Sequence, residues 1–202
     1  MLKLGEILKR FGGRLQTGPF GSQLHAHEYQ SEGVPVVMPQ DINDGCIGVR
    51  QIARIHERRA EELGRHRMRV GDIVIARRGD LSRAAAIGEA EVGWLCGTGC
   101  FLLRLAGSSL SPDFASLVYR QSFVQRQVDA RAVGATMPSL NNAVMSSLLY
   151  PFCATEEQEL IVKRIASSEN VLVENLKNQH ALKQQKQGLM QDLLTEKVSV
   201  QL

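Results

Sequence analysis

The chain has 202 residues, an apolar fraction of 44% and a net charge of +3, which suits one folded domain with an appendage. It has no apolar run of about 18 residues, so no membrane span is expected, and Met1 to Arg14 lacks the apolar stretch of a secretory signal. The four cysteines form no CxxC pair, so we expect a cytoplasmic protein with reduced, mostly buried thiols.

The first informative segment is the loop Thr17-Gly18-Pro19-Phe20-Gly21-Ser22-Gln23-Leu24. Its two glycines and its proline predict a tight turn. Thr17, Ser22 and Gln23 offer small polar groups that suit phosphate oxygens or base edges. Loops of this composition are also common as plain connections, so both interpretations stay open.

The next segments predict strands and a short helix. Val34 to Pro39 is an apolar run typical of a strand, and Asn43-Asp44-Gly45 is a turn signal between it and a second strand at Ile47 to Ile52. Glu57 to Leu63 predicts a charged helix with Gly64 at its C-terminal cap.

A second hairpin with a basic loop is predicted further along. Gly71-Asp72 turns into a buried strand at Ile73 to Ala76, and Ala84 to Gly88 is the expected partner strand. The connection, Arg77-Arg78-Gly79-Asp80-Leu81-Ser82-Arg83, carries three arginines and a serine. A DNA-reading finger and a solvated charged hairpin explain this composition equally well.

The remaining part of the domain predicts one more strand and a broken helix. Phe101 to Leu105 reads as a strand. Ser111-Pro112-Asp113 has the cap, the proline and the early acid of a helix start, and the helix should run to Gln121 and, after a break, to Ala130.

A long helix should follow from Thr155 to about Leu194, because this stretch contains no proline and one glycine. Thr155 can cap it, with Gln158 reaching back to complete a capping box. Its apolar residues recur on one side: Ile161, Ile165, Leu172, Leu176, Leu182, Leu189 and Leu193. Such a helix spans about 60 Å, which exceeds the diameter of a small domain. We therefore expect an α+β fold, with a mixed domain at residues 1–153 and a long dimerisation helix within residues 154–202.

Charge divides unevenly between these two regions. Residues 1–154 hold 16 Arg and 2 Lys against 14 acids, and residues 155–202 hold 6 basic and 7 acidic residues. Arginine suits bidentate recognition of phosphate and guanine. A GC-rich genome that favours arginine codons explains the same bias, so the composition alone does not decide for nucleic acid.

Catalysis has little support in the sequence. His25 and His27 lack an acid or cysteine at a spacing that completes a metal site, and Cys96 to Cys100 has no zinc spacing. Gly97-Thr98-Gly99 lacks the rest of a nucleotide-binding signature. No carboxylate cluster for Mg²⁺ stands out. We therefore expect neither a cofactor nor a catalytic metal.

Five segments, in order, resemble the DNA specificity subunits of type I restriction–modification systems. They are Thr17 to Ser22, Gly71 to Gly79, Gly134-Ala135-Thr136-Met137-Pro138-Ser139-Leu140-Asn141, Pro151-Phe152 with Glu157-Gln158, and Lys186 to Thr195. The resemblance covers nearly the whole chain. Cys153-Ala154 replaces the family's usual pair of prolines, and Glu196 stands where a glycine often follows.

The resemblance implies a non-catalytic, cofactor-free subunit that reads double-stranded DNA for a methyltransferase (modification) subunit and a restriction (helicase–nuclease) subunit. A full-length member has two recognition domains held apart by two antiparallel helices, and this sequence matches one of each. We expect a homodimer that rebuilds the pair as an antiparallel coiled coil. Its target would be a bipartite, interrupted palindrome.

The loops and the helix supply the candidate residues. Those expected at DNA are Thr17, Ser22, Gln23, Arg77, Arg78, Ser82, Arg83, Thr136, Ser139 and Asn141. The apolar residues of the helix are expected at the dimer and methyltransferase interface. Two alternatives remain: a stand-alone DNA methyltransferase or nuclease, and a coiled-coil DNA-binding regulator without modification partners.

Overall fold

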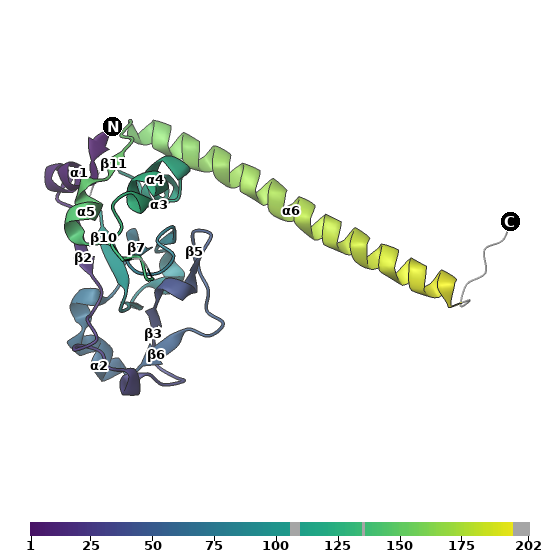
Figure 1. Ribbon diagram of the computed structural model, residues 1–202, viewed down its shortest axis with the longest axis horizontal. Coiled ribbons are helices and arrows are strands. Elements are labelled where there is room, and N and C mark those ends of the chain that lie inside the picture. The colour runs from purple at the N-terminus through teal and green to yellow at the C-terminus, as the bar shows by residue number, and fades with distance from the viewer. Residues whose placement is uncertain (106–109, 135, 196–202) are drawn as a thin grey trace. The chain divides into compact units, whose positions relative to one another are not determined.

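The structure, a computed structural model, describes residues 1–105, 110–134 and 136–195 (Figure 1). Two compact units divide the chain, Met1–Glu159 and Leu160–Leu202. Ala135 and Glu196, which figure in the resemblance, and residues 197–202 of the expected helical region lie outside the described residues.

The first unit combines helices with short strands, which confirms the predicted α+β class. Its helices are α1 (Leu4–Phe11), α2 (Glu57–Glu62), α3 (Pro112–Tyr119), α4 (Ser122–Asp129), α5 (Asn142–Ser147) and the first turn of α6 (Thr155–Leu194). Single turns of 3-10 helix lie at η1 (Ala26–Glu28), η2 (Pro39–Asp41), η3 (Gly64–His66) and η4 (Glu89–Glu91).

The main sheet is antiparallel, with the strand order β2-β10-β7-β8. Its strands are β2 (Arg14–Thr17), β10 (Cys100–Arg104), β7 (Asp72–Ala76) and β8 (Ala84–Ala86). The predicted strands near 73–76 and 101–105 are confirmed and lie side by side, and β8 is the predicted hairpin partner of β7. All residues of β7 are buried, which explains their continuous apolar run.

A second sheet corrects one prediction. It has the order β6-β3-β9, with β6 at Ala53–Ile55, β3 at Val34–Val37 and β9 at Leu95–Cys96. The predicted strand at Ile47 to Ile52 is wrong beyond its first residue, because β3 pairs with β6 and with the distant β9. The pairing with β9 is parallel and long-range, so no local turn signal reveals it.

The Asn43-Asp44-Gly45 signal does mark a turn, but in a smaller hairpin. It joins β4 (Ile42–Asn43) to β5 (Cys46–Ile47), and both Asp44 (φ 46°) and Gly45 (φ 82°) have the left-handed conformation of a primed turn. The remaining strand pair, β1 (Leu2–Lys3) with β11 (Leu149–Tyr150), joins the start of the chain to the end of the domain.

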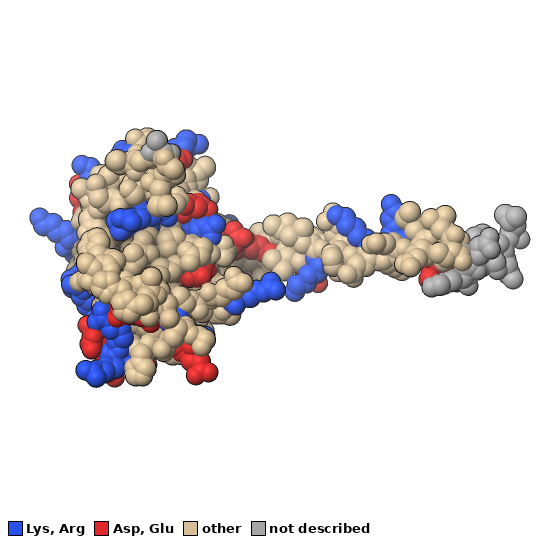
Figure 2. Space-filling model, turned by 60° about the horizontal axis from the view of Figure 1, so that its bottom comes forward, with Lys and Arg blue, Asp and Glu red and all other residues tan. Residues whose placement is uncertain are grey.

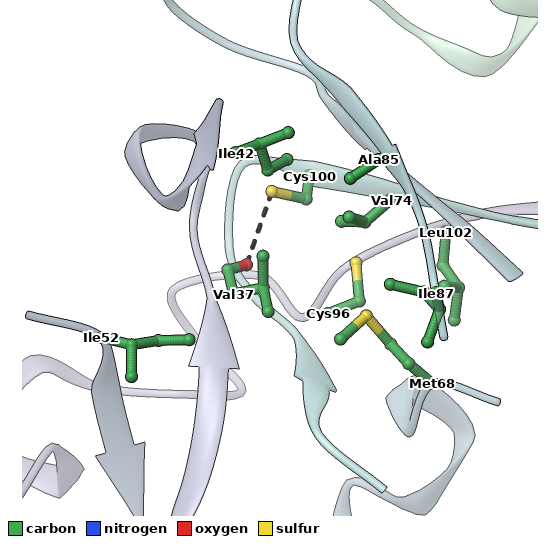
Figure 3. Packing of buried hydrophobic residues seen from close by; sticks show 10 residues of the cluster. All are labelled: Val37, Ile42, Ile52, Met68, Val74, Ala85, Ile87, Cys96, Cys100 and Leu102. Atoms are coloured by element: carbon green, nitrogen blue, oxygen red, sulfur yellow. Dashed lines mark hydrogen bonds between the residues drawn. The ribbon is translucent and has the colours of Figure 1, made fainter. Parts of the chain in front are cut away.

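A hydrophobic core joins the two larger sheets (Figure 3). Val74 and Leu102 come from the main sheet, and Val37 and Cys96 come from the second sheet. The Cys100 thiol lies 3.5 Å from the backbone oxygen of Val37 and donates to it across this contact. The shared core therefore holds the two sheets together, and the connecting loops leave from the ends of their strands.

The helices agree with their predicted starts but not with every predicted cap. Ser111 caps α3 and α4 follows after a short break, as predicted. Gly64 does not cap α2: Leu63 is the C-cap and Gly64 opens the next 3-10 turn. The sequence analysis missed α1, although its buried Leu4, Ile7 and Leu8 have helical spacing.

The long helix has the predicted span but a different start. Ala154 accepts the first helical hydrogen bond, from the Gln158 N–H, and Thr155 is already helical. The buried Gln158 side chain accepts from the Ser111 N–H (2.8 Å) and donates to the Cys153 carbonyl (2.9 Å). The predicted capping box is therefore wrong, because Gln158 ties the start of α6 to the start of α3.

The second unit consists of α6 from Leu160 onward. Of the predicted apolar stripe, Ile161 and Ile165 are half-buried, and the five leucines Leu172, Leu176, Leu182, Leu189 and Leu193 are exposed, with Leu182 at 65%. Within the residues that the structure describes, no helix is long and apolar enough to cross a membrane.

Candidate nucleic-acid interface

Two of the predicted segments meet although they are far apart in the sequence. The β7–β8 loop, residues 77–83, forms a β-bridge between Arg78 and Ser139. The Gly79 N–H donates to the Pro138 carbonyl (3.1 Å), and the Leu140 N–H donates to the Arg77 carbonyl (3.0 Å). The loop is therefore hydrogen-bonded to the segment that precedes α5, so the candidate residues of the two segments lie close together.

The Gly-Pro loop after β2 joins the same place. The Gly18 N–H donates to the Cys100 carbonyl (2.8 Å), and a Cβ added at Gly18 would lie 2.0 Å from the Gly97 oxygen, so only glycine fits there. From this loop Phe20 reaches Arg77, whose Cζ lies 5.8 Å from the centre of the ring. All three segments that carried candidate DNA contacts are thus in contact.

Arg77 is the half-buried member of the arginine pair, whereas Arg78 is exposed. Its Nε is buried and has no hydrogen-bond partner among the described residues, and burial, with a smaller effect of Arg78, lowers its pKa. Arginine stays charged despite such a shift. The guanidinium therefore has hydrogen-bonding capacity that the described part of the protein does not use, held in place by the Phe20 ring.

Arg78 is exposed and lines a pocket of about 360 Å³. Thr98, Gly99 and Pro39 form one part of the pocket wall, and Met137, which is 61% exposed, contributes another. The pocket combines an exposed cation with apolar surface. Such a surface suits both a phosphate and the flat face of a base.

The other end of the basic loop is held by its own hydrogen bonds. Asp80 accepts from the N–H and the hydroxyl of Ser82 and pairs with Arg83 Nε (2.9 Å), and these contacts, Ser82 first, lower the pKa of Asp80. Arg83 Nη1 also donates to the Asn43 side chain (2.9 Å) and the Ile42 carbonyl (3.1 Å). Arg83 thereby fastens the basic loop to the β4–β5 hairpin.

Several other predicted residues also have structural contacts. Gln23 Oε1 accepts from the Phe20 N–H (3.1 Å), and the Ser139 hydroxyl donates to the Val133 carbonyl (3.2 Å). Asn141 caps α5 by accepting from the Val144 N–H (2.9 Å). Thr17, half-buried at the end of β2, and the exposed Ser22 and Thr136 complete the predicted set.

The candidate face extends beyond the predicted residues. A second pocket of about 360 Å³ adjoins the first, since Asp80 and Arg83 line both, and a third of about 440 Å³ shares Gln40 with the first and Asn43 with the second. Arg120 and Arg50 line these pockets. Sequence reasoning missed both, because each is a single arginine outside any motif. On the side of the first unit that Figure 2 shows, basic residues are interspersed with acidic ones, so charge alone does not mark the candidate face.

The rejected catalytic candidates have ordinary surroundings. His25 and His27 stack on each other at 5.5 Å between ring centres, and no metal-binding group of His, Cys, Asp and Glu side chains occurs in the described part of the chain. Cys96 and Cys100 are buried as expected, whereas Cys46 is exposed. Burial raises the pKa of Cys96 to about 12, so its thiol is unreactive.

Comparison with known proteins gives a consistent picture. No protein-family model matches the chain. It is 24% identical over 172 residues to a protein of Methanocaldococcus jannaschii that is named as the specificity subunit of the type I restriction enzyme MjaX. The match covers 82% of this chain and 40% of that relative.

Solved structures share the fold over nearly the entire chain. The HsdS subunit from Thermoanaerobacter tengcongensis matches with a TM-score of 0.66 and 20% identity, covering 96% of this chain and 48% of that one. A chain from a study of complex assembly in a type I system matches with a TM-score of 0.62 and 16% identity, covering 95% of this chain and 44% of that one. The S subunit from M. genitalium matches with a TM-score of 0.57 and 17% identity, covering 95% of this chain and 43% of that one.

The chain resembles a type I restriction–modification specificity subunit in sequence and in fold, which confirms the resemblance predicted from the motifs. It spans less than half the length of each of these four proteins.

Proposed function

We propose that the protein is a DNA specificity subunit of a type I restriction–modification system, a cytoplasmic, non-catalytic component that recognises double-stranded DNA. One observation carries the proposal: three separate sequence segments meet at a single face where, within the described residues, Arg77 and Arg78 have donors without a partner. These are the same segments that resemble the family's motifs. The relative and the solved structures carry the names of such subunits.

The candidate residues divide by role within this proposal. Arg78, Ser22 and Thr136 are exposed and would contact DNA directly. Arg83, Ser82 and Asn141 already have partners inside the protein and would position the loops around them. Phosphate contacts would supply affinity for any sequence, and base contacts would supply the choice of sequence.

The exposed leucines of α6 support a proposal about assembly. A strip of leucines on a helix favours a second apolar strip. Two copies paired antiparallel through α6 would hold two recognition domains apart, and the methyltransferase subunit would cover the rest of the strip. The restriction subunit would join this complex.

The test is a selection from a randomised duplex library with the purified full chain, alone and with its methyltransferase subunit. The proposal expects enrichment of a bipartite motif whose halves are separated by a fixed spacer. Recovery of unselected sequences under both conditions contradicts it. Cleavage or methylation by the chain alone would favour a stand-alone enzyme, and tight selection of a single undivided site without the partner would favour a regulator.

A further inference from the structure

A pocket next to the basic loop is lined by Arg120, an arginine that lies outside the sequence motifs. It has a volume of about 360 Å³ and lies between the β4–β5 hairpin and the C-terminal end of α3. Its lining combines two arginines with two aspartates and two amide side chains: Arg83, Arg120, Asp44, Asp80, Asn43 and Gln121.

Arg120 lies with its flat face over Gly45. A Cβ added to Gly45 would lie 2.9 Å from the Arg120 Cζ, 2.9 Å from Nη2 and 3.2 Å from Nη1. Nearly equal distances to these three atoms place the glycine above the guanidinium plane, because an approach along the edge would bring the nitrogens much closer than the carbon. A side chain at residue 45 would therefore collide with the face of the guanidinium.

The donors of Arg120 are unused within the described residues. Its Nε is buried without a hydrogen-bond partner, and its guanidinium forms no ion pair there. A half-buried arginine that lacks a partner loses hydration without compensation. Its position is thus explained better by a ligand that supplies acceptors than by folding alone.

The composition of the pocket favours a base over a phosphate. Asp44, which forms no ion pair within the described residues, would repel a phosphate group, whereas the edge of a base pair offers both acceptors and amino donors. Arginine binds the O6 and N7 acceptors of guanine with two hydrogen bonds. Asn43 and Gln121 add groups that both donate and accept.

The pocket is also rigidly joined to the proposed DNA face. Arg83 bonds Asp80 of the basic loop and Asn43 of the hairpin, and it lines both this pocket and the pocket of Arg78. A base edge read by Arg120 would therefore lie at a set position relative to the contacts of Arg78.

We propose that Arg120 is a specificity-determining residue that reads a guanine edge in the major groove, and that the β4–β5 hairpin is a second recognition element. This inference rests on the proposed function, because it assigns part of the same DNA face.

The experiment compares Arg120→Ala and Arg120→Lys with wild type, using the full chain, its methyltransferase subunit and the duplex recovered by selection. Arg10→Ala on α1, an exposed arginine that lines none of these pockets, is the matched control. We expect both Arg120 variants to weaken binding of the selected duplex about 5- to 100-fold. We also expect repeated selection with either variant to lose the preference at one G·C pair.

Three results would overturn the inference. Unchanged affinity of both variants would show that Arg120 does not contact DNA. Equal weakening on selected and scrambled duplexes would show a phosphate contact only. A wild-type chain that selects no sequence would contradict the proposed function as well. This outcome distinguishes a failure of the proposed function from a failure of the Arg120 inference alone.

A second measurement does not depend on the fold of a variant. Cys46 follows Gly45 directly and is an exposed thiol, whereas Cys96 and Cys100 are buried. The selected duplex should slow alkylation of Cys46 in the wild-type complex, as read by mass spectrometry of the peptide. An unchanged rate under saturating duplex would show that the hairpin stays in solvent.

Discussion

Asp72 shows how a motif residue can serve the fold and not the ligand. Its two carboxylate oxygens accept from Arg104 Nε (2.9 Å) and Nη2 (2.7 Å), and one of them also accepts from the Arg69 N–H (2.9 Å). Asp72 is 2% exposed. The pair locks the entry of β7 to β10, the strand beside it, and so sets the direction in which the basic loop leaves the sheet.

Replacing Asp72 with alanine should therefore lower stability strongly. Removal of one partner leaves the Arg104 charge partly buried without compensation, which costs about 3–5 kcal/mol of unfolding free energy. Urea denaturation measures the loss, with Glu32→Ala, an exposed acid, as the control. If Asp72→Ala and Glu32→Ala unfold at the same urea concentration, the ion pair does not hold the sheet.

The arginines of the basic loop should separate by role. Arg78→Ala should cost about 1–3 kcal/mol of binding free energy and relax the preference at one position if Arg78 reads a base. Should it contact phosphate, binding to all sequences would weaken and the salt slope would fall by about one unit.

Alanine at Arg83 should instead loosen the loop and reduce stability together with binding. Wild-type affinity of alanine variants at Arg77, Arg78 and Arg83 over a salt titration would place the loop away from DNA.

At the scale of elements, sequence reasoning succeeded where the signal was local. The hairpin of β7 and β8, the capped start of α3 and the span of α6 follow from turn residues, caps and the absence of proline. The predictions failed where the two segments in contact are far apart in the sequence. The parallel pairing of β3 with β9 and the use of Gln158 at Ser111 depend on contacts between remote segments.

The candidate site shows the same division. The motifs identified the segments that gather at one face, but not that Arg83 and Asn141 would find partners inside the protein. Arg120 carried no signal at all, because its role depends on the close approach of Gly45 from another element. Spacing along the chain cannot reveal such a contact.

The leucine strip of α6 leads to a prediction about assembly. The variant Leu176→Asp, Leu182→Asp should fail to co-purify with the methyltransferase subunit, because full burial of each leucine is worth roughly 1.5–3 kcal/mol. Asn170→Asp, Gln191→Asp adds the same charges at exposed positions outside the leucine strip and serves as the control. A stoichiometric complex with the leucine variant would place the assembly surface on the first unit.

The length of α6 should set the distance between half-sites. Deleting residues 177–183 removes one heptad, about 10 Å of helix, and keeps the apolar strip in register. The spacer of the target should then shorten by about three base pairs, or binding should be lost, as measured by selection from a randomised library. An unchanged spacer would mean that α6 does not separate the recognition domains.

In the proposed homodimer, symmetry would determine the form of the target. Two identical recognition domains related by a two-fold axis read identical half-sites in inverted orientation. A subunit with two different domains would allow two unrelated halves. The sequence of the target thus reports on the assembly as well as on recognition.

Methylation mapping of DNA from cells that carry this chain with its methyltransferase subunit tests both DNA recognition and the homodimer. We expect one new methylated motif, an interrupted palindrome, which disappears when the chain is removed. An asymmetric motif would contradict the homodimer. A methylation pattern that is the same with and without the chain would contradict DNA recognition itself.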